Sequence, residues 1–455
     1  MKFAVPEKLK ALSGLLTASL YVVGGACRDF LGALERADGE KKDWDICSPT
    51  LAEEVACAAE KCGFTVTATY KNTGTVRMCA DGEEYEFTSF RTDRYVRGMH
   101  SPAEVFFTDD MVLDARRRDF KCNAVYYSVT EEKFCDPLGG IADIENRVIS
   151  TVAPPEKVFG EDGLRLMRLC RIAAETGFTP TEECLEGARV NAELIRDIAV
   201  ERIWAELNYI LHADAKYGVA GAQYAGLKLL DKTGVLDIIL PELTLGRGME
   251  QRSDFHSYDV LEHSLRCVLY APPGVRLAAL LHDVGKPISK LQTGRFAGHE
   301  VTGCEEAEKI LSRFKVGKKL SAQVCGLVRW HMYDLSGETS VNKIKKFIVS
   351  HGDIYGDLLL LKQADYSACK DDLSVAPCIL RWESIRKDMQ TEGVPLTLKQ
   401  LAVKGDKLIG AGISPDETGK TLNFLLGECV VGNVRNEEES LIRLALAHTG
   451  KKCKY

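Results

Sequence analysis

The sequence predicts a chain with a mixed α/β part over residues 1–150 and an all-α part from there to the C terminus. Six runs in the first part have the β-branched and aromatic enrichment of strands: LYVVGG, DWDI, FTVTATY, YEFTSF, CNAVYYSV and RVISTV. Beyond residue 155, apolar side chains recur with a helical period, as in EDGLRLMRLCRIAAE and ERIWAELNYIL.

Composition limits the class of protein. The chain has 455 residues, of which 45% are hydrophobic and 27% charged, as in an ordinary globular protein of several domains. The net charge of −7 excludes a uniformly basic nucleic-acid coat. No apolar run reaches the ~20 residues that span a bilayer, and the N-terminal segment lacks a signal-peptide pattern. The 16 cysteines include no C-x-x-C pair, which argues against a zinc ribbon or a thioredoxin-type site. We therefore expect a cytoplasmic protein without a membrane contact.

Turn-rich segments and a histidine cluster divide the chain into four expected parts. DPLGG (136–140) and VAPPEKVFG (152–160) separate the α/β part from the helices. Five of the nine histidines fall between positions 256 and 331, which indicates a site and a module of its own. The expected parts are 1–150, a helical neck and body over 151–240, a histidine-containing module over 241–370, and a helical tail over 371–455.

The first candidate site begins with a glycine turn. Tyr21 to Val23 form a predicted buried strand that runs into Gly24-Gly25, and Arg28 follows in the first turn of a predicted helix. Two glycines allow close backbone approach to a phosphate, and a helix N-terminus offers free N–H groups to an anion. By itself the segment also fits an ordinary strand-to-helix turn.

Paired carboxylates follow on the next predicted strand. Asp43 and Asp45 lie two residues apart, so strand alternation directs both to one face of the sheet. A divalent cation removes their mutual repulsion, which makes them candidate ligands for magnesium. Glu86, on a later strand, is a candidate third carboxylate. The arrangement suits phosphoryl or nucleotidyl transfer, and an exposed acidic turn before Ser48 is the alternative interpretation.

A basic cluster completes this set of motifs. Arg116, Arg117 and Arg118 precede a predicted strand, and guanidinium groups match phosphate oxygens. A solvated charge run would explain the arginines alone. The order of glycine turn, paired aspartates and basic cluster within one α/β unit favours a site for a nucleoside triphosphate.

These motifs resemble a known family. GGACRD, DWDI, YEFTSFR, RRRDFKCNA and EDGLRLMRLCR resemble, in this order, the motifs of class II tRNA nucleotidyltransferases, the CCA-adding enzymes, whose head belongs to the DNA polymerase beta superfamily. The resemblance is close over residues 20–210 and looser to the end. It implies an α/β nucleotidyltransferase head with Mg²⁺ held by Asp43 and Asp45. It also implies that Gly25 and Arg28 contact the nucleotide phosphates or ribose and that Arg118 reaches the triphosphate.

The resemblance further implies a base-reading helix. Asp162, Arg165, Arg168 and Arg171 match the helix whose side chains read the base of CTP or ATP in this family. Their spacing of three predicts one helical row, on which an Asp acceptor beside an Arg donor can present a hydrogen-bonding edge to a base. The same spacing fits a ladder of ion pairs on a solvated helix.

One segment departs from the family pattern. RTDRYVRGMHSPAEV has Arg97 where the family usually has an acid, and His100-Ser101 where it has an arginine before proline. Because this region helps the family switch from C to A addition, the resemblance leaves open whether this chain adds all three nucleotides.

The second candidate site is a metal site in the helical part. Histidine and aspartate adjoin in LLHDVGK, a pattern that resembles the HD superfamily of metal-dependent phosphohydrolases. His299 and His331 are candidates for a second ion or for phosphate. The predicted ligands of a divalent metal, of undetermined identity, are His263, His282, Asp283 and Asp365.

The combined prediction is template-independent addition of C, C and A to the 3′ end of tRNA from CTP and ATP, with release of pyrophosphate. The helical module is a possible phosphohydrolase acting on RNA 3′ ends. The alternatives are a CC-adding or A-adding specialist, a poly(A) polymerase, an HD phosphohydrolase with a nucleotide-binding head, and a catalytically silent RNA-binding protein. We predict tRNA as the macromolecular partner and no stable protein partner.

Overall fold

The computed structural model describes residues 3–37, 43–94 and 103–450. The chain divides into two compact units, one of Met1–Thr244 with Ser312–Val316 and one of Leu245–Leu311 with Gly317–Tyr455. The first unit contains a sheet, and in the second unit the described elements are all helices, joined by turns and loops. The predicted fold class, an α/β head followed by an all-α remainder, is confirmed. The finer division into four parts stays a prediction.

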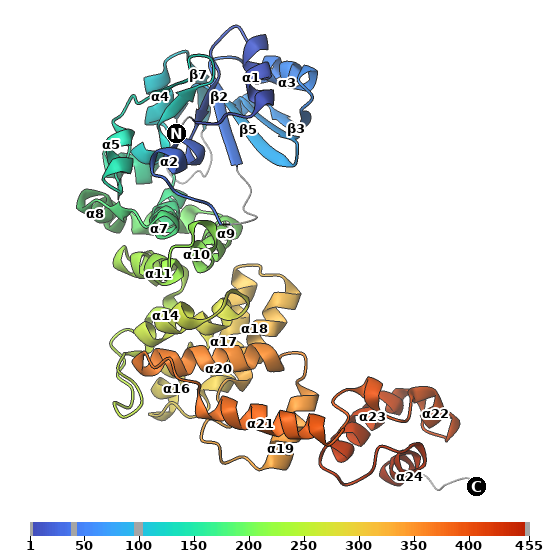
Figure 1. Ribbon diagram of the computed structural model, residues 1–455. Coiled ribbons are helices and arrows are strands. Elements are labelled where there is room, and N and C mark those ends of the chain that lie inside the picture. The colour runs from blue at the N-terminus through green and yellow to red at the C-terminus, as the bar shows by residue number, and fades with distance from the viewer. Residues whose placement is uncertain (1–2, 38–42, 95–102, 451–455) are drawn as a thin grey trace. The chain divides into compact units, whose positions relative to one another are not determined.

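A seven-stranded mixed sheet forms the head, in the order β3-β4-β5-β2-β1-β8-β9 (Figure 1). The strand β1 lies between β2 and β8 and is antiparallel to both, whereas β2 and β5 run parallel. The sheet strands are β1 (Tyr21–Val23), β2 (Asp43–Ser48), β3 (Thr65–Tyr70), β4 (Thr75–Ala80), β5 (Glu83–Ser89), β8 (Tyr126–Ser128) and β9 (Lys133–Cys135). Two small pairs add β6 (Arg91–Arg94) with β7 (Glu104–Phe107), and β10 (Val148–Ile149) with β11 (Thr179–Pro180).

The turn from β1 into the next helix requires glycine. Gly24 has a φ of +77°, and a Cβ atom there would lie 2.8 Å from Oδ2 of Asp45. The glycine therefore lets the backbone pass directly beside a predicted catalytic carboxylate. The helices of the head are α1 (Glu7–Leu15), α2 (Gly25–Leu31), α3 (Ala52–Lys61), α4 (Met111–Arg116) and α5 (Gly140–Glu145).

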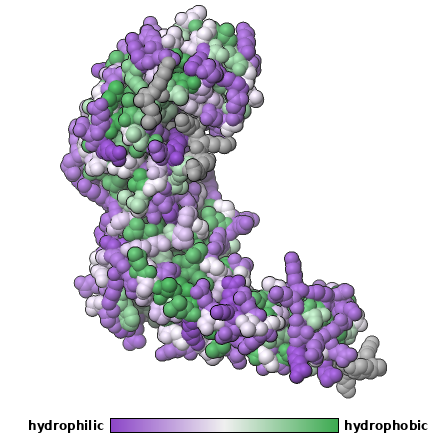
Figure 2. All heavy atoms as spheres, in the orientation of Figure 1, coloured by the Kyte–Doolittle hydropathy of each residue, from purple (hydrophilic) through white to green (hydrophobic). Residues whose placement is uncertain are grey.

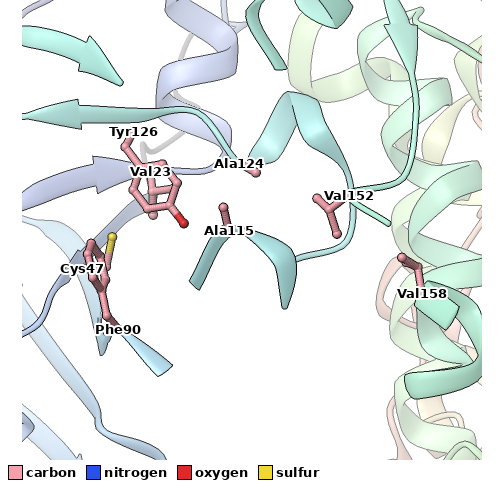
Figure 3. Packing of buried hydrophobic residues seen from close by; sticks show 8 residues of the cluster. All are labelled: Val23, Cys47, Phe90, Ala115, Ala124, Tyr126, Val152 and Val158. Atoms are coloured by element: carbon pink, nitrogen blue, oxygen red, sulfur yellow. The ribbon is translucent and has the colours of Figure 1, made fainter. Parts of the chain in front are cut away.

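The core of the head continues past its last sheet strand. Figure 3 shows side chains of β1, β2 and β8 together with Val152 and Val158, which lie in the turn-rich segment 152–160. Burial of these apolar groups is the main force that holds the first helix after the head against the sheet. The cluster consists of Val23, Cys47, Phe90, Ala115, Ala124, Tyr126, Val152 and Val158.

Helices complete the first unit, and α7 packs against α9, α10 and α11. It buries eleven of its thirteen residues, as the periodicity of EDGLRLMRLCRIAAE predicts for a core helix. The helices are α6 (Pro155–Glu161), α7 (Leu164–Thr176), α8 (Glu182–Val190), α9 (Val200–Leu211), α10 (Ala213–Tyr217), α11 (Ala222–Lys232), α12 (Val235–Ile239) and α13 (Pro241–Thr244).

The second unit is built around α14 and α20, which pack against each other and against α15. Its helices are α14 (Val260–Tyr270), α15 (Arg276–Leu281), α16 (Lys286–Thr293), α17 (His299–Arg313), α18 (Lys318–Trp330), α19 (Val341–Ser350), α20 (Tyr355–Lys370), α21 (Pro377–Thr391), α22 (Gly405–Gly410), α23 (Pro415–Val430) and α24 (Glu438–His448). Hydrophilic side chains cover much of the face shown in Figure 2, with hydrophobic ones between them. Among the described residues, no helix has the length and apolar character needed to cross a membrane.

Candidate active site and candidate metal centre

A cleft of about 870 Å³ in the first unit brings the motifs of the head and of α7 together. Its volume lies in the range of ligand sites for small molecules. Basic side chains outnumber acidic ones along its wall, which favours an anionic ligand. The basic residues are Arg28, Arg36, Arg77, Arg117, Arg118, Arg165, Arg168, Arg171, Arg202 and Lys216, and the acidic residues are Asp45, Glu84, Glu86, Asp119, Asp162 and Glu175.

Carboxylates stand on the sheet at the floor of this cleft. Asp45 is exposed on β2, and Glu86 is its register partner on the parallel strand β5. Arg77 Nε donates to Glu86 Oε2 at 3.1 Å. Asp43 also belongs to β2, two residues before Asp45, but its side chain lies outside the described part of the chain. Carboxylate oxygens are the donors that Mg²⁺ prefers, so the residues placed here fit that ion.

The arginine after the glycine turn is held rigidly. Arg28 is 3% exposed, and its Nη1 donates to Asn123 Oδ1 at 2.8 Å. Its Nη2 donates to Asp29 Oδ1 at 2.7 Å and to Tyr217 Oη at 2.9 Å. The Nε of Arg28 is buried and has no partner among the described residues. A fixed guanidinium with one buried donor left over fits a site that receives an anion.

A buried carboxylate of the head, that of Asp119, bonds to a side chain of α7. Asp119 accepts bonds from Arg168 Nε at 2.9 Å and Nη2 at 2.6 Å, and from Asn123 Nδ2 at 3.2 Å. Burial by itself raises the pKa of Asp119, but the Arg168 charge and its hydrogen bonds hold that pKa well below the usual range. Through Asn123, this network continues to Arg28. Asp119 and Asn123 stand in the motif RRRDFKCNA, yet the sequence analysis assigned neither a role.

The arginine cluster after α4 is partly structural. Arg118 Nε donates to Tyr126 Oη and Nη2 donates to Asp114 Oδ2, both at 3.1 Å. Asp114, fully buried, also accepts from Arg117 Nε at 2.8 Å. Burial raises the pKa of Asp114, but the charges of Arg118 and Arg117 lower it further than burial raises it. Arg117 and Arg118 line the cleft, whereas Arg116 is not among its lining residues.

Asp162 does not share a helical row with the arginines that follow it, and that expectation is wrong. Asp162 has an extended backbone (φ −146°, ψ 108°) that ends α6, and α7 begins at Leu164. The side chain instead accepts from the backbone N–H of Leu164 at 3.0 Å. Gly163, which joins the two helices, leaves no room for a side chain, because a Cβ there would lie 2.5 Å from the carbonyl oxygen of Leu194.

The first arginine of α7 supports the backbone around the cleft. Arg165 is 6% exposed, and its Nη1 donates to the carbonyl oxygen of Val158 at 3.0 Å. Its Nη2 donates to the carbonyl oxygen of Arg117 at 2.7 Å. Asp162 and Arg165 both line the cleft, as predicted for base reading, but Arg165 also joins two backbone segments.

The last arginine of α7 belongs to an ion-pair cluster. Arg171 Nε donates to Glu206 Oε2 at 2.6 Å, and Nη1 donates to Glu175 Oε1 at 3.1 Å. Arg202 on α9, which sequence reasoning missed, lies 3.7 Å from Asp162 Oδ2 through its Nη2. Its only sequence signal was a charged position in the helical run ERIWAELNYIL.

The second unit brings the four predicted metal ligands together. His263 comes from α14, His282 and Asp283 directly follow α15, and Asp365 comes from α20. The Nε2 of His263 lies 3.0 Å from Asp365 Oδ1 and 3.2 Å from His282 Nε2. The Nε2 of His282 lies 3.2 Å from Asp283 Oδ2. All four residues are buried.

Asp283 faces a second set of donors with its other oxygen. Its Oδ1 lies 3.2 Å from His299 Nε2 and 3.7 Å from His331 Nε2, and these two nitrogens are 3.2 Å apart. Lys286 Nζ lies 2.6 Å from Oδ2. Burial raises the pKa of Asp283, but the charges of His282 and Lys286 hold it well below the usual range. Asp283 thus stands among four imidazole nitrogens and one ammonium group, and imidazole with carboxylate is a donor set that divalent cations take.

Three of the four central imidazoles have a defined orientation. In each, Nδ1 bonds to a backbone carbonyl three residues earlier, which directs Nε2 at Asp283. The pairs are His282 with Ala279 at 2.8 Å, His299 with Phe296 at 2.8 Å, and His331 with Val328 at 2.7 Å. Imidazole and carboxylate donors suit several divalent ions, so the donor set fits a metal without selecting one.

Comparison with known proteins first defines the class. Residues 20–150 match the family model described as the poly A polymerase head domain. Residues 177–245 match the probable RNA and SrmB-binding site of polymerase A, and residues 256–374 match the HD domain. The chain is thus a nucleotidyltransferase with an HD domain.

The relatives define the family. An A-adding tRNA nucleotidyltransferase of Deinococcus radiodurans is 31% identical over 77% of this chain and 76% of its own length. A CC-adding tRNA nucleotidyltransferase of Thermus thermophilus is 29% identical over 92% of each chain. The crystal structure of the Bacillus stearothermophilus CCA-adding enzyme in complex with CTP is similar in fold, with a TM-score of 0.65 and 22% identity over 98% of this chain and 97% of that one. The chain belongs to the tRNA nucleotidyltransferase family.

Proposed function

We propose that the protein adds C, C and A to the 3′ end of tRNA, using CTP and ATP and releasing pyrophosphate. The observation that carries the proposal is the arginine-lined cleft with exposed Asp45 and Glu86 on its floor. Arginine forks bind phosphate oxygens, and exposed carboxylates hold the divalent ions of such reactions. We infer that the reaction takes place in the cytoplasm, where tRNA and nucleoside triphosphates are found together.

The residues of the cleft divide the work. The 3′ hydroxyl of tRNA forms a bond to the α-phosphorus, and the bond to the β-phosphate oxygen breaks as pyrophosphate leaves. Asp43 and Asp45, with Glu86 beside them, would hold Mg²⁺, which would supply positive charge at the reacting phosphate. Arg28 and Arg118 orient the triphosphate, and their fixed bonds to Asp29 and Asp114 remove the need to order them when the nucleotide binds. The turn at Gly25 brings the backbone to the phosphates.

We also propose that Asp162 reads the base. Its carboxylate lines the cleft at the start of α7 and can accept from the exocyclic amino group that cytosine and adenine share. Arg165 and Arg168 are proposed as its partners on the same wall, held by backbone carbonyls and by Asp119. Arg171 belongs to the same predicted set.

The experiment that tests the head separates CCA addition from its specialised alternatives. Purified protein is incubated with three tRNA transcripts, which end at the discriminator base, after C, and after CC, each with CTP or ATP alone. CCA addition requires incorporation of C on the first two and of A on the third. Absence of A on the third transcript identifies a CC-adding protein, and absence of C on the first two identifies an A-adding one. A long A tract on all three identifies a poly(A) polymerase.

A second activity is proposed for the HD domain because its donors form two sets around one buried carboxylate. His263, His282 and Asp365 with Asp283 Oδ2 suit one divalent ion, and His299 and His331 with Oδ1 suit a second. We propose hydrolysis of a 2′,3′-cyclic phosphate or a 3′-phosphate on RNA. Either group blocks the hydroxyl that the head requires, so both activities on one chain are chemically consistent.

The test of this activity begins with the metal content of the purified protein. Hydrolysis of a 3′-phosphorylated and a cyclic-phosphate RNA end is then measured with manganese, nickel, iron or magnesium supplied. Neither bound metal nor hydrolysis with any of the four ions would make the HD domain structural and would contradict this proposal.

A further inference from the structure

One central histidine lacks the orienting bond that the others have. His263 is completely buried, and its Nε2 faces Asp365 and His282 as a ligand would. Its Nδ1 is also buried but has no hydrogen-bond partner among the described residues. A histidine ligand of a metal almost always donates its second N–H to an outer partner, which orients the ring and strengthens the bond to the metal. The partner of His263 therefore has to come from elsewhere.

A further imidazole, that of His256 in the segment before α14, lies against the ring of His263. The ring of His256 lies 4.9 Å from that of His263, centroid to centroid, at an interplanar angle of 90°. The Nδ1 of His256 is likewise buried without a described partner. Ligand atoms of His256, His263 and Cys369 all lie within 4.8 Å of one another. The ring of His256 thus packs directly against the ring of His263, and each ring has a buried Nδ1 without a described partner.

The helix that carries Asp365 also holds His256 in place. The backbone N–H of Ser257 donates to the carbonyl oxygen of Cys369 at 2.9 Å, and Lys370 Nζ donates to the carbonyl oxygen of Asp254 at 2.6 Å. Cys369 and Lys370 both belong to α20, one turn after Asp365. The Cys369 thiol donates to the carbonyl oxygen of Asp365 at 3.3 Å, which leaves it a poor partner for an imidazole.

We propose that His256 is a positioning residue that accepts the Nδ1 proton of His263, directly after a small ring rotation or through one water, and so orients His263 toward a divalent ion. This inference rests on the proposed metal centre of the HD domain. It assigns to the segment at Asp254–Ser257 a part in metal binding, although none of its residues contacts the ion. Three of the four histidines are oriented by a backbone carbonyl three residues earlier, and the fourth, His263, by a residue in the segment before α14.

The test measures metal affinity on the full chain with the head carboxylates replaced (Asp43→Asn with Asp45→Asn), so that bound Mn²⁺ reports the HD domain. The metal-free parent and three variants of it, His256→Ala, His256→Gln and Phe255→Ala, are each titrated with Mn²⁺ by calorimetry. We expect about a 10- to 100-fold weaker Kd for His256→Ala, the usual effect of losing an outer partner. His256→Gln should recover most of that loss because its amide oxygen can accept the proton, and Phe255→Ala, an exposed neighbour, should bind as the parent does.

A second measurement separates positioning from packing. The melting temperature of the metal-free protein should fall only slightly in His256→Ala, because the buried Nδ1–H of His263 loses its acceptor, and His256→Gln should restore it. Equal Mn²⁺ affinity of His256→Ala and the parent, an equal loss in Phe255→Ala, or a lowered metal-free melting temperature without rescue by Gln would each overturn the inference. If the parent itself binds no Mn²⁺, the proposed metal centre fails, and this inference with it.

Discussion

The two sites of this protein solve opposite electrostatic problems. In the cleft of the head, most charged side chains are ion-paired before any ligand arrives, and the cleft is open to molecules of nucleotide size. In the HD domain, one buried carboxylate is surrounded by four imidazoles. The first arrangement is neutralised by its own ion pairs and fits a large anion, whereas the donor set of the second fits small cations. The comparison teaches that unpaired buried donors and acceptors mark an ion site, and paired arginines mark a prepared anion site.

The largest expected effect tests the independence of the sites. Asp45→Ala, or Asp43→Ala, should lower nucleotide addition by about 10³-fold or more, because charge stabilisation in the transition state is lost. Hydrolysis by the HD domain should not change. Incorporation is measured with labelled CTP and ATP on a tRNA transcript, with tRNA binding measured in parallel. Asp81→Ala, an exposed carboxylate of the same sheet region, is the control. Addition near the parent rate by the Asp45 variant would remove the head assignment.

The reciprocal change breaks the other site. His282→Ala and Asp283→Ala should each abolish measurable hydrolysis of a 3′-phosphorylated RNA end while nucleotide addition to an intact end continues. Loss of a buried ligand removes the ion and leaves the remaining charges unpaired. His351→Ala, a histidine of the same unit that stacks on Phe347, serves as the control. Retained hydrolysis in both variants would place this activity outside the HD domain.

A pH-dependent stability effect is expected from the paired carboxylates of the head. The pKa of folded Asp119 lies well below its unfolded value near ~3.9, because Arg168 stabilises the charged form. The unfolded state therefore binds more protons around and below about pH 4, so stability falls as the pH falls through this window. At pH 7, Asp119→Asn should cost about 3–5 kcal/mol, since Arg168 loses its buried partner. Urea unfolding at about pH 7, 4 and 3 should show the difference from the parent shrinking toward acid, because the stability linked to Asp119 is lost only below about pH 4. A constant difference would assign the loss to packing.

The smallest expected effect concerns base selection. Asp162→Ala should reduce the free-energy discrimination against UTP and GTP, relative to CTP and ATP, by about 1–3 kcal/mol, because a base-reading acceptor is lost. Its melting temperature should change little, whereas Arg165→Ala should also be destabilised, because the carbonyl groups of Val158 and Arg117 lose their donor. Misincorporation assays with single nucleotides measure the first effect, and thermal unfolding the second. Unchanged selectivity in Asp162→Ala would show that this residue only caps α7.

Most of the fold class followed from local signals, because strands and helices have different periods. Strand alternation predicted one face for Asp43 and Asp45, with Glu86 as a candidate third carboxylate, and the parallel register of β2 and β5 pairs Asp45 with Glu86. Helical periodicity predicted α7 but extended its row to Asp162, since spacing alone does not show that the backbone is extended at Asp162. Side chains of Asp43, Arg97 and His100 lie outside the described residues, so predictions about them stay predictions.

What the sequence by itself determined is the set of chemical groups: glycines before a helix, acidic pairs on a strand, and histidines next to an aspartate. Each is a short-range pattern whose geometry comes from the backbone period. What only the tertiary structure decided is which groups meet across the chain. Asp119 bonds to Arg168, and the two oxygens of Asp283 face histidines from different helices. Hydrophobic burial sets how these helices pack, and because it is non-directional, no short sequence pattern shows which helices will meet. The orphaned Nδ1 of His263 likewise becomes visible only once its neighbours are in place.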